Sequence, residues 1–319
     1  MAKKNNNQVS AVRQAKHGWI WTLAFTVISI LWIAPILVVL LNSFKRKAFI
    51  FRHPFTLGTE PLSAGWDKFI HGVERAFCGW LNYSNGIRKT NFWNSFGISL
   101  FITVGSVALI IICCSMCAWY ITRVHTKVTK TIYVLCLFSM IVPFQMVMFT
   151  LSKFANLLHL SNPLGIIVVY LGFGAGLAVF MFTGFVKGIS LEIEEAAMID
   201  GCTPFKYLIR IVVPLSKPII AVLVLYYGVA RWNSYQDAIL YLQKANYLQP
   251  LQIILREILI MNDIDETMMG NADALARQRG LKDLLQYSVI VIASVPVMII
   301  YPFVQKYFVK GVMIGAVKG

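Results

Sequence analysis

One polar segment, residues 190–214, combines acidic, small and turn-forming residues in an order that could dock another protein. Its three glutamates are Glu192, Glu194 and Glu195. Acidic residues favour the positive N-terminal end of a helix, Ser190 is a suitable cap for that helix, and Gly201 can take the left-handed conformation that ends it. Thr203 can cap a second helix that has Pro204 at its first position. The segment therefore predicts two short helices joined by a tight turn.

The chemistry that this arrangement predicts is docking. Ala196 and Ala197 are small enough for close approach to a partner, and a sharp turn at Gly201 gives a compact projection that can enter a partner's groove and move as a lever. The alternative is an amphipathic helix lying on lipid. Such helices favour Lys and Arg on their polar face, whereas this one is acidic before Gly201, and we therefore favour docking.

Residue types that serve catalysis or metal binding form no recognisable site in this sequence. The five histidines are scattered, and neither an HExxH nor a nucleophile-elbow pattern occurs. Cys113, Cys114 and Cys117 share part of a helix face and could bind a soft metal, but no histidine or carboxylate joins them, so we interpret them as packing residues. A phosphate-binding P-loop needs a Gly-Lys pair, which this chain lacks. We predict no catalytic residue, no metal site and no enzyme activity.

The elements that must position the polar segment are membrane helices. Of the 319 residues 58% are hydrophobic and only 13% are charged, and the mean hydropathy is +0.67, whereas soluble domains carry about 25% charged residues. Crossing a bilayer takes about 20 apolar residues. Six stretches come near or beyond that length: residues 19–41, 93–120, 132–158, 164–186, 211–242 and 284–307. The sequence therefore predicts an all-α polytopic membrane protein with six transmembrane helices.

Glycines in the fourth span indicate where helices approach one another closely. Three of them, Gly172, Gly174 and Gly176, recur at every second position. Small residues let membrane helices pack backbone to backbone. We expect a close helix contact at this set.

Basic residues indicate how the spans are oriented. The net charge of +15 comes from short clusters beside the spans and not from a basic face with interleaved aromatics, so we predict no nucleic-acid partner. Cytoplasmic N- and C-termini place most clusters inside, as the positive-inside rule requires; the basic residues 45–47, after the first span, oppose this orientation. The predicted organisation is a cytoplasmic segment 1–18, a transmembrane domain 19–307 with the polar segment 190–214 on its cytoplasmic side, and a cytoplasmic tail 308–319.

The polar segment resembles the EAA loop of ATP-binding-cassette (ABC) importer permeases. The order Glu195-Ala196-Ala197, three residues, Gly201, nine residues, Ile211, one residue and Val213-Pro214 is similar to that motif, with Val213 where leucine is usual. In that family the loop forms a coupling helix docked on the ATPase subunit. The resemblance implies a type I ABC importer fold. It assigns ATPase coupling to Glu195, Ala196, Ala197, Asp200, Gly201, Ile211 and Pro214.

A wider resemblance covers nearly the whole chain. Residues 142–145, 162–165, 232–234 and 310–319 look like stretches of carbohydrate-uptake permeases similar to the second membrane subunit of the maltose transporter. This implies a subunit of the bacterial inner membrane that helps to import sugars, oligosaccharides in particular, by alternating access. The implied partners are a second permease subunit forming a heterodimer, two ATPase subunits that bind ATP and magnesium, an extracellular solute-binding protein and membrane lipid. No cofactor is expected in this chain itself.

Two alternatives to sugar import stand beside this interpretation. An EAA loop is also found in permeases for amino acids, peptides and phosphate, and an ion-coupled carrier or channel is a different class altogether. Ion coupling usually needs ionisable residues deep in the membrane. Here Lys153, Lys217, Arg231 and Asp237 lie near span ends or in the polar half of the fifth span, where Arg231 could pair with Asp237. A carrier would transport alone, whereas a permease subunit would need its ATPases.

Direct sugar contacts, where this subunit makes them, are expected in the fifth span. Sugars are recognised by aromatic faces and by amide or carboxylate hydrogen bonds. The candidate substrate-path residues are Trp232, Asn233, Tyr235 and Asp237. Aromatics in membrane helices are more commonly interfacial or packing residues, and in the resembled family the companion permease can hold most substrate contacts.

Overall fold

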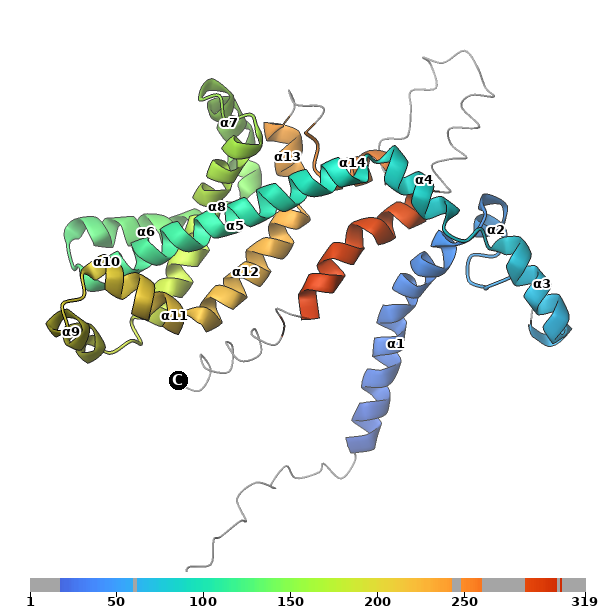
Figure 1. Ribbon diagram of the computed structural model, residues 1–319, viewed down its shortest axis with the longest axis horizontal. Helices are drawn as coiled ribbons and strands as arrows, with labels where there is room; N and C mark the ends of the chain where they lie inside the picture. Colours follow the sequence, from blue (N-terminus) through green and yellow to red (C-terminus); the bar gives the residue numbers. More distant parts are fainter. Residues whose placement is uncertain (1–17, 60–61, 243–247, 260–284, 303–304, 306–319) are drawn as a thin grey trace, which may run out of the picture. The chain divides into compact units, whose positions relative to one another are not determined.

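The computed structural model describes residues 18–59, 62–242, 248–259, 285–302 and 305, and this part of the chain is almost entirely helices and short connections (Figure 1). The described residues form two compact units, one ending at Asn82 and the other beginning at Tyr83. Nearly all of the predicted segment 1–18 and the whole predicted tail 308–319, with its family-like motif, lie outside the described residues.

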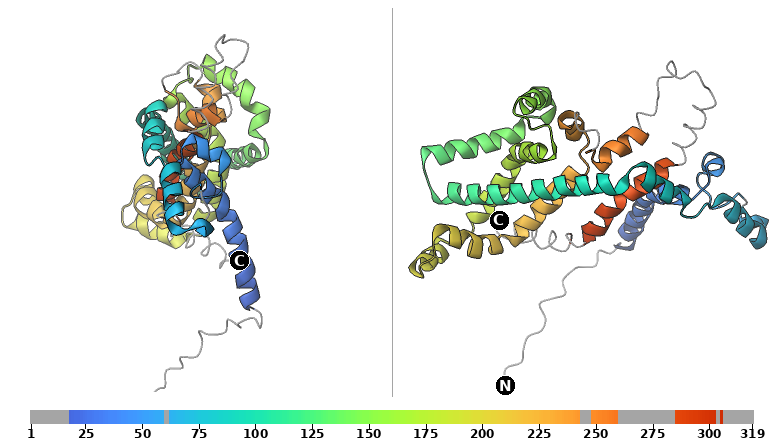
Figure 2. Two further views of the ribbon diagram at one scale, coloured as in Figure 1. Left: turned by 90° about the vertical axis from the view of Figure 1, so that its right-hand side faces the viewer. Right: turned by 45° about the horizontal axis from the view of Figure 1, so that its top comes forward.

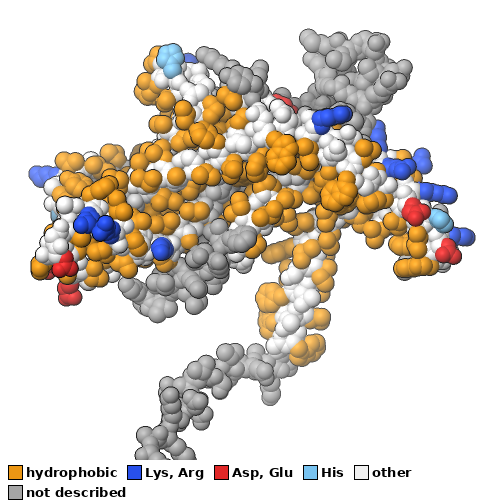
Figure 3. Space-filling model, in the orientation of Figure 1, with side chains coloured by type: hydrophobic (Ala, Val, Ile, Leu, Met, Phe, Trp, Pro, Cys, Tyr) orange, Lys and Arg blue, Asp and Glu red, His pale blue; other side chains and the backbone are white. Residues whose placement is uncertain are grey.

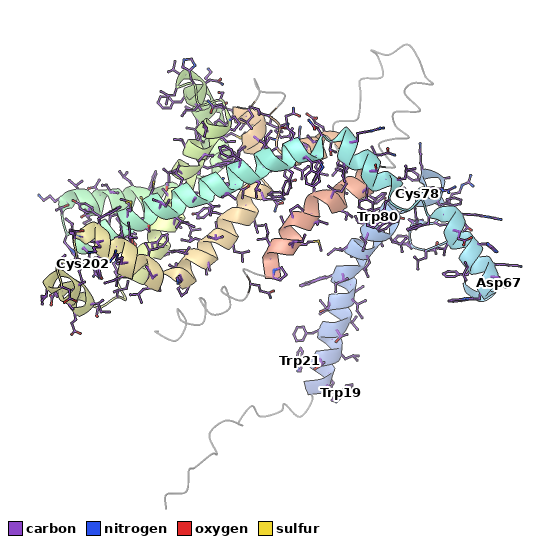
Figure 4. The ribbon with its side chains drawn as sticks, in the orientation of Figure 1. Trp19, Trp21, Asp67, Cys78, Trp80 and Cys202 are labelled. Atoms are coloured by element: carbon purple, nitrogen blue, oxygen red, sulfur yellow. The ribbon has the colours of Figure 1, made fainter. Side chains whose placement is uncertain are left out.

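The first unit begins with a long apolar helix, α1 (Gly18–Ser43), whose 26 residues reach about 39 Å at 1.5 Å per residue. Trp19 and Trp21 lie at its start and point away from the helix axis (Figure 4), as expected where a span enters the headgroup region. The unit continues through α2 (Lys47–Arg52), a short 3-10 helix (Leu62–Ala64), α3 (Trp66–Ala76) and the start of α4 (Leu81–Lys89).

A buried lysine organises the chain directly after α1. The Lys45 ammonium donates hydrogen bonds to Asn42 Oδ1 at 2.9 Å and to the His53 carbonyl at 2.8 Å. The Asn82 side-chain amide donates to the carbonyls of Ser43 and Lys45 at 3.0 and 2.9 Å. Lys45 is only 2% exposed, and burial, which penalises the charged form, lowers its pKa to about 8. One of the three basic residues that oppose the predicted orientation is therefore an internal structural group.

The second unit is built around α8 (Pro163–Val186), which packs against α5 (Phe92–Arg123), α6 (Lys127–Ile141) and α12 (Lys217–Trp232). After a short corner α6 runs back beside α5 (Figure 1; Figure 2). The core between these helices holds Ile110, Ala178, Phe182 and Leu223, each at most 1% exposed. The other helices are α7 (Phe144–Leu157), α9 (Leu191–Ile199), α10 (Pro204–Tyr207), a π-helix (Leu208–Val212), α11 (Val213–Leu215), α13 (Gln236–Tyr241), α14 (Leu251–Leu259) and the long helix Leu285–Pro302.

The described helices provide four to six membrane spans. Four are long and apolar enough to cross a membrane, and six result if each of two bent helix pairs is one span. The predicted span 132–158 is divided into α6 and α7, between which the chain bends by 111°. Pro143 precedes α7, and a proline both removes a backbone donor and disfavours helix at the residue before it. The predicted span 211–242 is bent by 75° at Ser216 and is interrupted again after Trp232.

The described residues expose many large apolar side chains. Hydrophobic side chains cover much of the face shown in Figure 3, and charged side chains gather over α9 and α10, near the corner between α5 and α6, and over α3. On α6, Leu135 and Phe138 are 61% and 60% exposed. Such surface needs lipid or another membrane subunit to cover it.

Two of the glycines in the predicted set Gly172, Gly174 and Gly176 of α8 lie at a close helix contact, as predicted. A Cβ added at Gly176 would lie 2.6 Å from the Cys136 carbonyl oxygen of α6, and one at Gly174 would lie 2.6 Å from Ile110 Cδ1 of α5. The Tyr227 hydroxyl of α12 also donates to the Gly174 carbonyl at 2.6 Å. A Cβ at Gly172 would meet nothing within 4 Å, so the close contact is confined to the other two.

We expect Gly176→Ala to destabilise the chain and Gly172→Ala to leave it unchanged or slightly more stable. The first substitution pushes a methyl group against a backbone carbonyl that can move only with α6, an overpacking cost of about 1–3 kcal/mol. The second enters open space on the same helix and gains helix propensity. Thermal unfolding of the detergent-solubilised protein measures both. Equal midpoints for the two variants would contradict the close contact between α6 and α8.

Candidate functional site

The predicted pair of short helices is present as α9 and α10, separated by a tight turn. Gly201 has φ +77°, its N–H donates to the Met198 carbonyl at 3.0 Å, and the Cys202 N–H donates to the Ala197 carbonyl at 2.9 Å. These two bonds form a Schellman motif, in which a left-handed glycine satisfies the last carbonyls of a helix. The turn is therefore built by Gly201, as the sequence predicts.

The caps of the two helices differ in quality. Ser190 occupies the cap position of α9, but its side chain makes no capping hydrogen bond. Thr203 Oγ1 accepts from the Lys206 N–H at 3.4 Å, and Pro204 stands at the first position of α10. The start of α10 is therefore fixed locally, by the Thr203 cap and by Pro204. Figure 4 labels Cys202 in this turn.

The seven residues assigned to coupling divide into an outward and an inward group. Those exposed in the single chain are Glu195, Ala196, Asp200, Gly201 and Pro214. Ala197 is only 5% exposed and, with half-buried Ile211, packs among Val186, Tyr207 and Val212. Ala197 therefore cannot offer the open surface for a partner that its small size suggested. It lies three residues after buried Glu194 and hence on the same, inward face of α9.

Large apolar side chains surround the turn on its outward side, and the sequence reasoning missed them. Ile199 is 86% exposed, Phe205 59% and Met198 47%. Solvent-exposed apolar residues beside exposed carboxylates are typical of a surface that another protein covers. The available signal was an apolar residue on either side of the turn in an otherwise polar segment.

A buried ion pair fixes this projection to the membrane helices. Arg123 Nε lies 2.6 Å from Glu194 Oε2, and the two side chains are 11% and 10% exposed. Arg123 also donates from Nη2 to the Ile189 carbonyl at 3.3 Å. Because Arg123 is the last residue of α5 and Glu194 lies in the first turn of α9, the pair joins a membrane span directly to the projecting helix. From the sequence, Glu194 was placed only among the acids at a helix start, and Arg123 was not singled out.

A second polar cluster lies where α12 ends and α13 begins. Asp237 Oδ2 accepts a hydrogen bond from Ser234 Oγ at 2.6 Å and lies 3.6 Å from Arg231 Nη1. The Arg231 guanidinium also lies 4.0 Å from the centre of the Tyr170 ring. The pairing of Arg231 with Asp237 that the sequence suggested is therefore confirmed. The pair lies at the break between α12, which ends at Trp232, and α13, which begins at Gln236.

The four candidate substrate-path residues lie in different environments around this break. Trp232 is 5% exposed, with its ring packed edge-on against Phe96 at 5.7 Å, and Asp237 is 8% exposed. Asn233 and Tyr235 are exposed. Of the four, only Asn233 and Tyr235 are open to a ligand in the single chain, whereas Trp232 and Asp237 are buried.

Among the described residues no three or more His, Cys, Asp or Glu side chains come together in a way that could hold a metal ion. Cys114 is buried in the core beside Phe182 and Leu223, an environment of packing and not of coordination.

Comparisons with known proteins match most of this chain to membrane components of transport systems. The family model described as "Binding-protein-dependent transport system inner membrane component" matches residues 110–314. The probable starch degradation products transport system permease protein AmyC of Thermoanaerobacterium thermosulfurigenes is 31% identical, over 94% of this chain and 97% of that protein. The arabinooligosaccharides transport system permease protein AraQ of Halalkalibacterium halodurans is 29% identical, over 95% and 97%.

The fold is similar to that of a solved transporter. One chain of the crystal structure of a bacterial ABC transporter involved in the import of the acidic polysaccharide alginate superposes with a TM-score of 0.73, over 94% of this chain and 99% of that one, at 23% identity. With the family match over more than half of its length, the chain belongs to the family of binding-protein-dependent transport system inner membrane components.

Proposed function

We propose that this chain is a permease subunit of an ATP-driven importer that carries oligosaccharides into a bacterial cell. The observation that carries the proposal is the exposed turn between α9 and α10, held on the end of α5 by the Arg123–Glu194 ion pair. Relatives named as permeases for starch degradation products and arabinooligosaccharides support the sugar class. Membership of a family of transport components makes the chain a transport protein and not an enzyme.

The outward face of the turn suits insertion into a separate ATPase subunit. Ile199 and Phe205 would fill an apolar groove, and the carboxylates of Glu195 and Asp200 would meet polar or basic groups around it. ATP and magnesium would be bound by that subunit, because this chain has no Gly-Lys pair for a P-loop. Gly201 keeps the turn compact enough to enter.

Motion of the turn would reach the membrane along two routes. The Arg123–Glu194 pair connects α9 to α5, and the π-helix and α11 connect α10 to the bend before α12. Since α5 and α12 both pack on α8, a displacement of the projection would turn these helices as a body. Rigid-body rotation about an interface is a common form of such switching, and here it would open a path alternately to the two sides.

A complete transporter needs more than this chain. We propose a heterodimer with a second permease, two ATPase subunits on the cytoplasmic side, an extracellular solute-binding protein, and lipid around the apolar surface. Both termini would lie in the cytoplasm of the bacterial cell, and the chain would bind no nucleic acid. Asn233 and Tyr235, exposed beside the polar break, would face the sugar path, with Trp232 and Asp237 holding them in place.

Reconstitution tests the function directly. We expect uptake of starch- or arabinan-derived oligosaccharides into proteoliposomes only when this chain is present with its copurified permease and ATPase partners, binding protein and ATP. The chain alone should transport nothing. Uptake by the chain alone, driven by an ion gradient, would overturn the proposal.

We expect Gly201→Asp to lower ATP-driven uptake at least fivefold while leaving the amount of chain in the membrane close to normal. A residue with a Cβ pays roughly 1–2 kcal/mol in the left-handed conformation, and the added carboxylate would also enter the partner's groove. Gly188→Asp, an exposed glycine shortly before α9, adds the same charge outside the turn and serves as the control. Equal uptake in the two variants would argue against docking of this turn.

Replacing the ion pair separates packing from transmission. Arg123→Met or Glu194→Met alone should destabilise the chain by about 3–5 kcal/mol, because each leaves a buried charge unpaired. The double substitution should restore most of that stability yet reduce the oligosaccharide imported per ATP hydrolysed, since the fixed connection between α5 and α9 is lost. A double variant with the parent's ratio of uptake to hydrolysis would show that the pair only stabilises the fold.

A further inference from the structure

A basic hollow lies at the corner where α5 ends and α6 begins, with the end of α8 on its third side. Its volume is about 480 Å³. The basic and titratable residues that line it are His125, Lys127, Lys130 and Lys187, and the threonines are Thr122, Thr126, Thr129 and Thr183. The only other lining residues are Ile121 and Tyr133. No carboxylate is among the residues that line the hollow.

One hydroxyl in the hollow has no hydrogen-bond partner among the described residues. Thr183 is 1% exposed and its Oγ1 makes no hydrogen bond to any described residue. The other two buried threonines are satisfied: Thr122 donates to the Ala118 carbonyl and Thr129 to the Val124 carbonyl, each at 2.7 Å. A buried hydroxyl left without a partner is costly, and its place in the lining of a hollow indicates that it serves a molecule from outside.

The charges around the hollow make that molecule an anion. None of Lys127, Lys130 and Lys187 forms an ion pair with a described residue. The Lys187 ammonium lies 5.8 Å from the centre of the Tyr133 ring, a contact that leaves the cation available. The 15-residue helix α6 adds its positive N-terminal end at the same place. Three ammonium groups with no counter-charge repel one another unless an anion neutralises them.

The position of the hollow along the helices indicates a lipid and not a soluble anion. It lies where α5 and α6 change from apolar to polar sequence, at Ile121–Thr122 and Lys130–Ile132. Exposed Val128 and Val134, 67% and 53% accessible, lie on α6 beside the lining lysines, and Tyr120 is 51% exposed at the end of α5. Aromatic and basic residues above an apolar surface mark the headgroup level of a bilayer.

We propose that this hollow binds the phosphate of an anionic phospholipid headgroup. Lys130 and Lys187 hold the phosphate from two helices, and the Thr183 hydroxyl donates a hydrogen bond to it from the floor. The acyl chains lie along the exposed apolar side chains of α6. The site depends on the membrane placement of the chain and is independent of the cargo that it carries.

Lipid binding to the full-length chain, purified with its partners, tests the proposal by native mass spectrometry. We expect phosphatidylglycerol to bind more tightly than phosphatidylcholine. Lys130→Gln with Lys187→Gln should weaken phosphatidylglycerol binding roughly tenfold or more, since each basic residue near an anionic headgroup is worth several-fold in affinity. The matched control, Lys153→Gln with Lys217→Gln, removes two exposed lysines outside the hollow. It should change the affinity for phosphatidylglycerol little.

Thr183→Val separates a ligand-binding hydroxyl from a merely unsatisfied one. Valine keeps the shape and removes the unpartnered group, so the fold should be no less stable. Weaker phosphatidylglycerol binding in this variant, with an unchanged thermal midpoint, is the expected result. Unchanged binding in both hollow variants, or equal losses in the hollow and control double variants, would overturn the site.

Competition distinguishes the lipid from other occupants. Inorganic phosphate and glycerol 3-phosphate at millimolar concentration should not displace the lipid. Displacement by either would show a site for a free anion and contradict the proposal. A hollow variant that loses a protein partner while its phosphatidylglycerol binding is unchanged would assign the surface to an acidic protein and overturn it as well.

Discussion

The contact between Arg123 and Glu194 is the connection on which the rest of this structure depends. It is the buried ion pair that joins the end of a membrane span to the helix projecting from the helical bundle. The turn at Gly201 could be well formed and still transmit nothing if α9 were free to tilt on its own. The pair, together with Ala197 and Tyr207 packed in the cluster between α9 and the membrane helices, connects the projection to α5. Chains of packed side chains and salt bridges of this kind can carry coupling between distant sites, as the proposed function needs.

The second polar cluster repeats the same physical pattern. Arg231 lies in the last turn of α12 and pairs with Asp237 in the first turn of α13, just as Arg123 ends α5 and pairs with Glu194 in the first turn of α9. In both cases a cation lies at the negative end of one helix and a carboxylate at the positive end of another, so each charge is stabilised by its own helix as well as by its partner. This arrangement lets a low-dielectric interior hold charges where the chain changes direction.

Local physics accounts for what could be predicted from the sequence. The Schellman turn follows from one glycine, the cap of α10 follows from Thr203 and Pro204, and six apolar stretches follow from composition. The 111° bend at Pro143 and the inward position of Ala197 depend on what packs against those segments. Arg123 and Glu194 lie far apart in the chain and share no pattern, so their pairing emerges only when α5 and α9 are brought together. Site residues defined by local geometry were therefore predictable, and those defined by tertiary contact were not.

An apolar contact could have joined α5 to α9 at lower desolvation cost, since buried ion pairs are often no more stable than well-packed hydrophobic residues of the same volume. What the pair adds is a defined geometry. Apolar side chains tolerate sliding and repacking, whereas a guanidinium and a carboxylate 2.6 Å apart lose their interaction steeply when either moves, because the buried charge left behind has no water to solvate it. A helix that is pushed by a partner and must carry the span with it gains from such a contact. In the proposed coupling role, the pair therefore contributes a defined geometry in addition to stability.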